Sequence, residues 1–301
     1  MSQTAFALDR QGNITAIPAV TTVVFTAHNR RDMVLDAIRL ALGQTVPVHV
    51  IVADDASSDG TQAAVAKAFP GVTYLRSDMS RGPCYQRNRG IERAQTEIVF
   101  PLDDDSMLVD PTTLEIALGD FAAADVAIVC MPFNNVLQDK RIHHVAAHGR
   151  PPETIDFAAC GHAVRRSAFL SVGGYDEDLF YTLEECDLAL RLLDAGGWRT
   201  IFGTSPVLHH MQQVGKASDI QDYTGARNKI LFYYRYAPKR YMPLRIVGGM
   251  ASALMLALRR RRRRPMPVLR GLRDGLAKVF SGKAKRDPVK RANFQAFLDQ
   301  R

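Results

Sequence analysis

The sequence predicts an α/β domain with a mostly parallel central sheet, followed by a basic helical region. Short β-branched runs alternate with stretches of helical periodicity through the first half of the chain. Several of the predicted strands run directly into polar residues, which is typical of sheets that bind ligands at the carboxyl ends of their strands. With 301 residues, 47% of them hydrophobic, the chain can bury a large core.

The predicted elements of the first half follow one another as strand, helix and strand. The strands are expected at 21–26, 48–53, 72–75 and 97–102, and the helices between them at 32–43, 61–69 and 86–94. Apolar residues at spacings of three and four predict the first helix, and Gly43 would end it. Farther along, the pattern predicts a strand near 126–131, a helix at 184–195 and a short strand at 199–202.

Three of these strands end in polar side chains that would meet at one edge of the sheet. Thr26 ends the first strand, Asp54 and Asp55 follow the second, and the cluster Asp103–Asp105 follows the fourth. Like charges packed together are costly unless a cation neutralises them, and carboxylates suit Mg²⁺ or Mn²⁺. The alternative is a solvated acidic turn. The apolar strand before the cluster and the second acidic strand end favour a metal site over that alternative.

Cysteine usage and the N-terminus indicate an intracellular protein. The four cysteines show neither metal-site nor disulfide spacing; they are Cys84, Cys130, Cys160 and Cys186. A reducing compartment fits this scatter. Residues 1–20 lack a basic start followed by an apolar run, so no signal peptide is expected. We therefore expect a cytoplasmic protein.

Charge is divided very unequally along the chain. The net charge is +8, but residues 1–234 carry −8 and residues 235–301 carry +16. The basic region contains an uncharged stretch, 246–258, followed by the six arginines Arg259–Arg264. An apolar anchor beside a polybasic patch predicts peripheral binding to the anionic inner face of the cell membrane. A buried helix with a solvated charged end is the alternative, and nucleic acid is not expected because aromatic interleaving is lacking.

These observations predict three segments. Residues 1–17 would form an N-terminal extension, residues 18–235 the α/β domain, and residues 236–301 the basic helical region. The acidic charge of the body and the basic charge of the last segment set the second boundary.

A set of motifs in consistent order gives the sequence a family resemblance. These motifs are FTAHNR at 25–30, VADDASSDGT at 52–61, QRNRGIERAQTEIVFPLDDDS at 86–106, VGGYDEDLF at 172–180, ECDLALRLLDAGGW at 185–198 with Glu184 before it, and VLHH at 207–210. Across residues 20–235 the chain resembles the inverting glycosyltransferases of the family 2 type, which have the Rossmann-like GT-A fold of nucleotide-diphospho-sugar transferases. The resemblance therefore implies a glycosyltransferase that acts in polysaccharide biosynthesis.

The resemblance implies a nucleotide site at the strand ends. Thr26 and Asp55 would line the nucleobase and ribose pocket, with Asp55 accepting from a pyrimidine N–H. Asp54 belongs to the same predicted pocket, although its turn-forming sequence is also compatible with a plain helix cap. Arg87 would approach the nucleotide from the helix before the fourth strand.

The acidic cluster would bind the metal and the donor. Asp103 and Asp105 match the two aspartates of the family's D-x-D motif, with Asp103 facing the ribose or the metal and Asp105 coordinating the metal. Asp104 occupies the variable middle position and is also assigned to the donor site. His209 is the better match to the histidine that reaches the metal or the diphosphate in the family, although a histidine pair is more often a packing feature. The expected cofactor is Mn²⁺ or Mg²⁺.

The predicted base lies at the start of the helix at 184–195, where backbone N–H groups favour anions. The family usually has Glu-Asp here, whereas this chain has Glu184-Glu185. Glu185 is the candidate that removes the acceptor proton, and Glu184 and Asp187 are alternatives. A helix start decorated with acids for purely structural reasons is the competing interpretation.

Two further residues are assigned to the same site. Gly161 lies in a Cys-Gly-His segment that would line the donor or acceptor pocket. Arg227, in a segment that resembles the family's tyrosine-then-Arg-Asn pattern, would contact phosphate or make internal links.

The predicted reaction is inverting transfer from a UDP- or dTDP-sugar to a hydroxyl of a glycan or lipid-linked acceptor. A nucleotidyltransferase is disfavoured because FTAHNRRDM lacks the glycine-rich loop expected after the first strand. A glycosidase would need two carboxylates but no aspartate triplet. A degenerate module that binds the nucleotide sugar without turnover stays open because of Glu-Glu in place of Glu-Asp.

Overall fold

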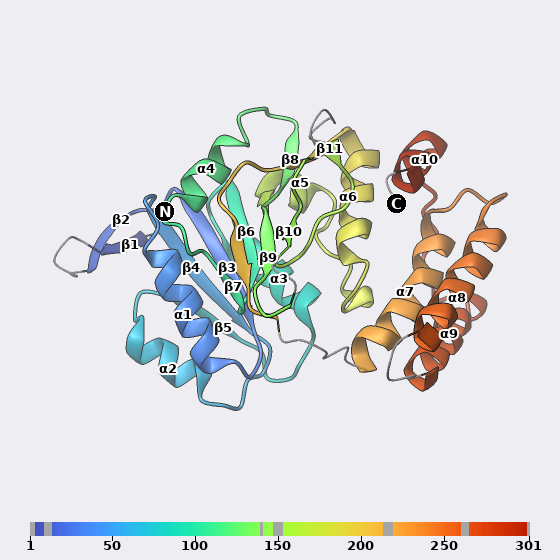
Figure 1. The fold of residues 1–301 in the computed structure, drawn as a ribbon, viewed down its shortest axis with the longest axis horizontal. Helices are drawn as coiled ribbons and strands as arrows, with labels where there is room; N and C mark the ends of the chain where they lie inside the picture. The colour runs from blue at the N-terminus through green and yellow to red at the C-terminus, as the bar shows by residue number, and fades with distance from the viewer. Residues whose placement is uncertain are drawn as a thin grey trace.

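An eight-stranded mixed sheet forms the centre of the molecule in this computed structural model (Figure 1). The structure describes residues 4–8, 14–138, 141–146, 153–212, 219–259 and 265–299. In spatial order the strands are β11 (Glu153–Thr154), β13 (Arg199–Phe202), β8 (Val126–Cys130), β12 (His162–Arg165), β6 (Ile98–Asp103), β3 (Thr21–Ala27), β4 (Val48–Asp54) and β5 (Thr73–Arg76). Strands β6, β3, β4 and β5 are parallel neighbours, and β12 pairs antiparallel with β6 and β8.

Helices cover both faces of this sheet. They are α1 (Arg31–Leu42), α2 (Thr61–Ala68), α3 (Pro83–Arg93), α4 (Thr113–Gly119), α5 (Arg166–Ser171) and α6 (Glu184–Gly196). Successive strand residues point to opposite faces. Val23 therefore packs in a core with α1, α2 and α4, whereas Val24 packs in a second core with α3, α5 and α6.

Helix α3 lies unusually close to strand β3 at Gly90. A methyl group added at Gly90 would lie 2.2 Å from Cγ1 of Val24. Only a residue without a side chain permits this approach. The contact fixes the height of α3 above the sheet, and with it the position of the functional side chains on the first two turns of that helix.

Two smaller sheets complete the strands. A hairpin of β1 (Thr4–Leu8) and β2 (Ile14–Pro18) lies at one end of the molecule. A four-stranded sheet has the order β10 (Ile142–His143), β9 (Phe133–Asn135), β14 (Leu208–His210) and β7 (Ser106–Met107). This small sheet brings residues near position 210 beside the chain that follows the aspartate cluster, and Met211 N donates to Asp105 O at 2.9 Å.

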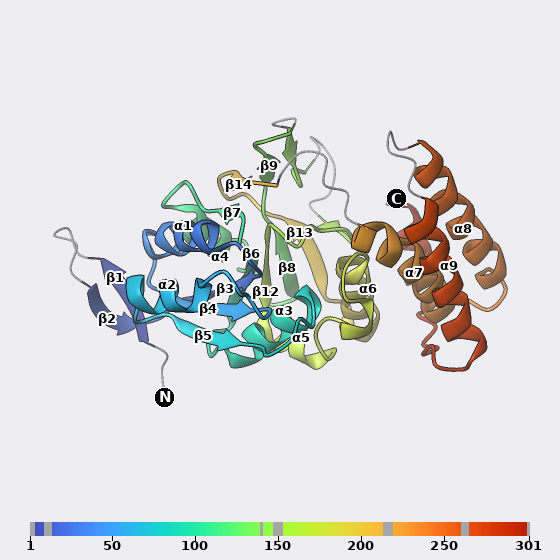
Figure 2. The same ribbon diagram turned by 90° about the horizontal axis from the view of Figure 1, so that it is seen from below.

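The C-terminal helices form a layer beyond α6, at the end of the molecule opposite the β1–β2 hairpin (Figures 1 and 2). They are α7 (Asp219–Tyr236), α8 (Met242–Arg259), α9 (Pro265–Phe280) and α10 (Arg291–Asp299). A core that includes Leu190 of α6, Phe232 of α7 and Phe297 of α10 joins this layer to the α/β body. Gly271 lets α9 approach α7, because a methyl there would lie 2.2 Å from Tyr223 O.

The predicted mostly parallel α/β architecture is confirmed, and most predicted elements begin and end within two residues of the observed ones. The helix expected at 86–94 begins earlier, at Pro83, a residue that suits the first helical position. The antiparallel strands β11 and β12 were not predicted. The proposed boundary between 235 and 236 falls in the last turn of α7, so the division into segments stays a prediction. Of the six arginines, 260–264 lie outside the described residues.

Among the described helices, none combines the length and the apolarity needed to cross a bilayer.

Candidate active site

The carboxyl ends of β3, β4 and β6 meet at one edge of the sheet. In the parallel ladders, Thr26 of β3 lies opposite Asp103 of β6, and Ala27 lies opposite Asp54 of β4. The strand ends that the sequence singled out are therefore neighbours. The hydroxyl of Thr26 is buried without a hydrogen-bond partner among the described residues. Because buried polar groups normally have partners, this hydroxyl is available to form a hydrogen bond with a ligand.

Asp55 follows β4 and is held by the loop that leads into α3. Its carboxylate accepts hydrogen bonds from Ser80 Oγ (2.5 Å), Arg81 N (2.7 Å), Gly82 N (3.1 Å) and Gln86 Nε2 (2.7 Å). Burial disfavours the charged form, but these donors outweigh it and lower the pKa of Asp55. A nucleobase N–H would have to replace one of these donors, so a ligand role for Asp55 requires the loop at 80–82 to adjust.

Asp54 faces away from that position. Its fully buried carboxylate accepts from the backbone and hydroxyl of Ser57 and from Arg76 Nη1 at 2.8 Å. These contacts close the turn after β4 and bind β5 to it. The geometry therefore gives Asp54 a turn-stabilising role. Its carboxylate does not belong to the group formed by Arg87, Asp103 and Glu184.

Arg87 of α3 joins the two acidic groups of the site. Its side chain is buried, and Nη2 donates to Asp103 Oδ1 at 2.5 Å. On the other side, Nη1 lies 3.4 Å from Glu184 Oε1 at the start of α6. Arg87 Nε and Glu184 Oε2 have no partner among the described residues. One guanidinium thus links the end of β6 to the first turn of α6.

Asp104 and Asp105 share the cation of Arg30. Arg30 Nη1 lies 3.0 Å from Asp104 Oδ1 and 2.6 Å from Asp105 Oδ2. Burial, reinforced by the neighbouring aspartates, raises the pKa of Asp104 to about 7 despite Arg30. Burial acts in the same direction on Asp105, but hydrogen bonds from His210 and Arg30 outweigh it and lower its pKa. The site therefore contains two neighbouring aspartates with opposite pKa shifts.

One cluster among the described residues has the composition of a metal site. Ligand atoms of Asp103, Asp105 and His210 all lie within 4.8 Å of one another. His210 Nε2 is 3.3 Å from Asp105 Oδ1, and its Nδ1 is 2.8 Å from Asn135 Oδ1, which fixes the ring. The resemblance of the VLHH motif favoured His209, but neighbouring residues of a strand point to opposite faces. In β14 it is His210 that faces the aspartates.

Glu184 and Glu185 occupy the first turn of α6. Glu184 is buried and Glu185 is half-buried. Burial raises the pKa of both carboxyls. The charge of Glu185 raises the pKa of Glu184 further, whereas Arg87 and a hydrogen bond from Glu184 only partly offset the rise at Glu185. A raised pKa brings a carboxyl closer to the range in which it can act as a base near neutral pH.

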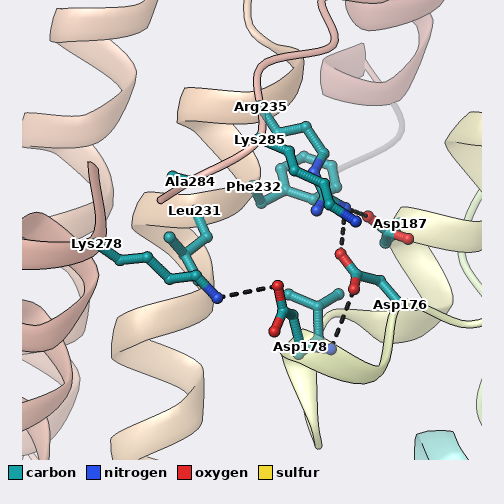
Figure 3. Close-up of a pocket in the computed structure, with 10 residues that line it drawn as sticks. Asp176, Asp178, Asp187, Leu231, Phe232, Arg235, Lys278, Ala284 and Lys285 are labelled. Carbon is teal, nitrogen blue, oxygen red and sulfur yellow. Dashed lines mark hydrogen bonds and ion pairs between the residues drawn. The ribbon is translucent and has the colours of Figure 1, made fainter. Parts of the chain in front are cut away.

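Asp187, the other candidate base, lies on a different side of α6. Its buried carboxylate accepts from Arg191 Nη2 at 2.6 Å, Tyr236 OH at 2.5 Å and Arg235 Nη1 at 3.1 Å. Arg235 also pairs with Asp176, as the close-up shows (Figure 3). Asp187 is therefore bound into the contact between α6 and α7, away from Arg87 and Asp103.

Gly161 and Arg227 lie in different surroundings. Gly161 O accepts from Met131 N at 2.9 Å, close to the aspartate cluster because Ser106 Oγ donates to the preceding carbonyl, that of Cys160. Arg227 donates to the carbonyls of Asp178 and Leu179 at 2.7 and 2.9 Å. Internal links, which the sequence left open as an alternative, are the observed contacts of Arg227.

Sequence reasoning missed three members of this arrangement. Arg30 pairs with the aspartate cluster, Gln86 holds Asp55, and His210 replaces His209 beside Asp105. Arg30 and Gln86 both belong to quoted motifs, so their place there was the available signal.

Solved structures define the class of the fold. A mannosyltransferase, PcManGT from Pyrobaculum calidifontis in complex with GDP-Man and Mn²⁺, superimposes with a TM-score of 0.57 at 19% identity, covering 93% of this chain and 84% of that one. S. aureus TarS 1-349 in complex with UDP gives a TM-score of 0.58 at 12% identity, covering 87% and 91%. The α/β domain with its mostly parallel sheet and C-terminal helices is a GT-A fold.

Sequence comparison gives the family. The model described as Glycosyl transferase family 2 matches residues 22–170. The succinoglycan biosynthesis protein ExoO of Rhizobium meliloti (strain 1021) is 40% identical over 118 residues, 38% of this chain and 34% of that protein. An N-acetylglucosaminyl-diphospho-decaprenol L-rhamnosyltransferase of Mycobacterium tuberculosis (strain ATCC 25618 / H37Rv) is 26% identical over 309 residues, 86% of this chain and 99% of the relative. Residues 22–170 of the chain therefore form a domain of glycosyl transferase family 2, an inverting family.

Proposed function

We propose that this glycosyltransferase moves a sugar from a nucleoside diphosphate to an acceptor hydroxyl between the ends of β3, β4 and β6 and the first turn of α6. One observation carries the proposal: the guanidinium of Arg87 contacts Asp103 and Glu184 at once. The end of β6, which carries the acidic cluster proposed for the donor, and the first turn of α6, which carries the glutamates proposed for the acceptor, therefore flank the same point. Inverting transfer needs these two groups on opposite sides of the reacting carbon.

Glu185 is the proposed base. It is less buried than Glu184, whose Oε1 already faces Arg87. Glu185 would take the proton of the acceptor hydroxyl as the acceptor oxygen bonds to the anomeric carbon. The bond from that carbon to the diphosphate oxygen breaks, and the nucleoside diphosphate leaves with the electron pair.

Asp103, Asp105 and His210 are the proposed ligands of a divalent ion. Two carboxylates and an oriented imidazole fit such an ion, and the mixed oxygen and nitrogen set suits Mn²⁺ better than Mg²⁺, which strongly prefers oxygen. A divalent ion bound there supplies positive charge against the diphosphate. Thr26, with its unpartnered hydroxyl, is proposed to contact the nucleoside.

A panel of donors tests this function. UDP-, dTDP- and GDP-sugars would be incubated with the protein and either Mn²⁺ or Mg²⁺, and nucleotide release would be measured with and without extracted lipid-linked acceptors. We expect release with a UDP- or dTDP-sugar, faster with Mn²⁺ than with Mg²⁺. The two structural neighbours were solved with GDP-Man and with UDP, so GDP-sugars are the necessary comparison. Equal rates with and without divalent ions would contradict the metal assignment.

A lipid-linked acceptor at a membrane surface is the proposed partner. The rhamnosyltransferase relative is named for a diphospho-decaprenol acceptor. Helix α8 presents a stripe of apolar side chains to solvent at helical spacing, comprising Leu244, Val247, Met255 and Leu258. Val247 is 62% exposed and Leu258 66% exposed. Exposed apolar rows in a region of net charge +16 favour anionic lipid.

Vesicle flotation tests this partner. The protein is expected to float with vesicles containing anionic lipid and to stay behind with neutral ones. Combining Val247→Glu and Leu258→Glu should lower the bound fraction about tenfold or more, because two apolar side chains can no longer be buried. Ile116→Glu on α4, also an exposed apolar position, is the matched control. Equal binding by the double variant and the control would refute this surface.

A further inference from the structure

The segment that leads into α6 has an unfavourable backbone. Phe180, Thr182 and Leu183 have φ values of 63°, 70° and 68°, in the left-handed region that suits glycine. None of the three is glycine or asparagine. Such conformations persist only where surrounding groups hold them.

Asn228 of α7 holds this segment. Its side chain is fully buried, and Nδ2 donates to the carbonyls of Leu179 (2.9 Å), Tyr181 (2.9 Å) and Thr182 (2.8 Å). An amide has two N–H groups, so one of them is shared between two carbonyls. Asn228 Oδ1 accepts from Arg227 Nε at 2.9 Å, which fixes which way the amide points. One side chain thus satisfies three carbonyls of the strained segment.

A second link ties the same helix to α6. Arg235 of α7 bridges Asp176, which precedes the strained segment, and Asp187 of α6, as Figure 3 shows. Lys278 of α9 adds a more exposed ion pair with Asp178 at 3.0 Å. Helix α7 therefore binds the chain on both sides of residues 179–183, at Asp176 before them and at Asp187 after them.

The strained segment sets where the carboxylates of α6 begin. Leu183 is the residue before the first helical turn, and no side chain caps this end. Its carbonyl accepts from Asp187 N at 3.0 Å, and Glu184 and Glu185 follow it directly. A change in the backbone at 182–183 would therefore displace both glutamates relative to Arg87 and Asp103.

We infer that Asn228 is a positioning residue for the carboxylates of α6, acting from the C-terminal helical layer through the carbonyls of residues 179–182. The inference rests on the proposed role of Glu185 as base. In the described part of the chain, the hydrogen bonds of the Asn228 side chain go to backbone carbonyls of this segment and to Arg227. Its effect would therefore fall on turnover and not on binding of the donor.

Asn228→Asp tests the inference, since aspartate has the same size but offers no N–H to the three carbonyls. We expect kcat to fall about 100-fold, the loss typical of a catalytic group misplaced by about 1 Å. The Kd of Mn²⁺–UDP should stay within about twofold, because Asp103, Asp105 and His210 are on other elements. In the pH profile of kcat, the acidic limb should move to lower pH as the loosened glutamates meet water and lose the burial that raises their pKa.

Ile230→Ala is the matched control. Ile230 lies on the same helix, is also fully buried, and packs toward α9 instead of the strained segment. It should lower the melting temperature while kcat, measured below that temperature, stays within about twofold of the wild type. Equal losses of kcat in Asn228→Asp and Ile230→Ala would mean that Asn228 is only structural and would overturn the inference.

Arg227→Met covers the case in which Asn228→Asp does not fold. It removes the hydrogen bonds to the carbonyls of Asp178 and Leu179, where the strained segment begins, and the bond that orients Asn228. Arg227 is half-buried. We expect a roughly tenfold fall in kcat with unchanged Kd for Mn²⁺–UDP. An unchanged kcat would overturn the inference, and so would a weaker affinity for Mn²⁺–UDP in place of a lower kcat. Glu185→Gln separates the two proposals: if it retains turnover, the base assignment fails whatever Asn228 does.

Discussion

Asp105→Asn is expected to lower turnover by about 10³-fold or more while the protein stays folded. Asp105 contributes one of the three ligand atoms that lie within 4.8 Å of one another, and removing its charge weakens the hold on a divalent ion. An ion that neutralises a leaving diphosphate contributes several kcal/mol to the transition state, which corresponds to this loss. Asparagine has the same size and can still accept from Arg30. The melting temperature should therefore change by only a few degrees, roughly 2–4 °C.

Calorimetry with Mn²⁺ and UDP measures the cause of this loss directly. The Kd of Mn²⁺–UDP should increase strongly in Asp105→Asn, because binding becomes weaker. Asp104→Asn is the matched control, because Asp104 is equally buried and pairs with the same Arg30 but does not belong to the metal cluster. Its turnover should fall much less. If Asp105→Asn kept both turnover and the affinity for Mn²⁺–UDP, the metal assignment would be wrong.

The sequence predicted the sheet edge well because local signals determine it. Buried apolar runs predict β3, β4 and β6, and the polar residues at their ends are the ones proposed for the site. In parallel strands of similar length these ends must be neighbours. The spacing of apolar residues likewise gives α1 and α6 almost to the residue.

The features that could not be predicted from the sequence depend on contacts between distant segments. Which histidine faces Asp105 depends on the register of β14 between β7 and β9, and a shift of one residue would exchange His209 and His210. Asp54 and Asp187 lie beside site residues in sequence but point elsewhere, because Arg76 and Arg235 bind them from other elements. An antiparallel strand such as β12 has no local signal that distinguishes it from a parallel one.

The Asn228 inference and the metal assignment concern opposite sides of one reaction. The end of β6 is fixed by the rigid sheet, whereas the start of α6 is fixed by α7, which belongs to the C-terminal layer. In the proposed reaction, donor binding and acceptor activation therefore depend on different parts of the fold. Substitutions in the layer should alter kcat with little change in donor affinity, and substitutions at the strand ends should alter both.

Glu185→Gln should lower kcat about 10²- to 10⁴-fold, the usual contribution of a general base, without weakening Mn²⁺–UDP binding. The base must be deprotonated to act, and burial raises the pKa of Glu185 above its ordinary value. Wild-type activity should therefore fall as the pH is lowered through this raised pKa, at a higher pH than a solvated glutamate would give. Steady-state kinetics across pH measure this limb, and it should disappear from the residual activity of Glu185→Gln.

Glu184→Gln separates the two glutamates. Glutamine keeps an oxygen for Arg87, so turnover should fall less than in Glu185→Gln; the reverse order would make Glu184 the base. Stability gives an independent test. Burial raises the pKa of Glu184, so the folded protein loses stability as the pH rises above the unfolded value of about 4.3 toward the raised one. Glu184→Gln lacks this penalty, and its melting temperature should exceed that of the wild type at neutral pH but not near pH 4.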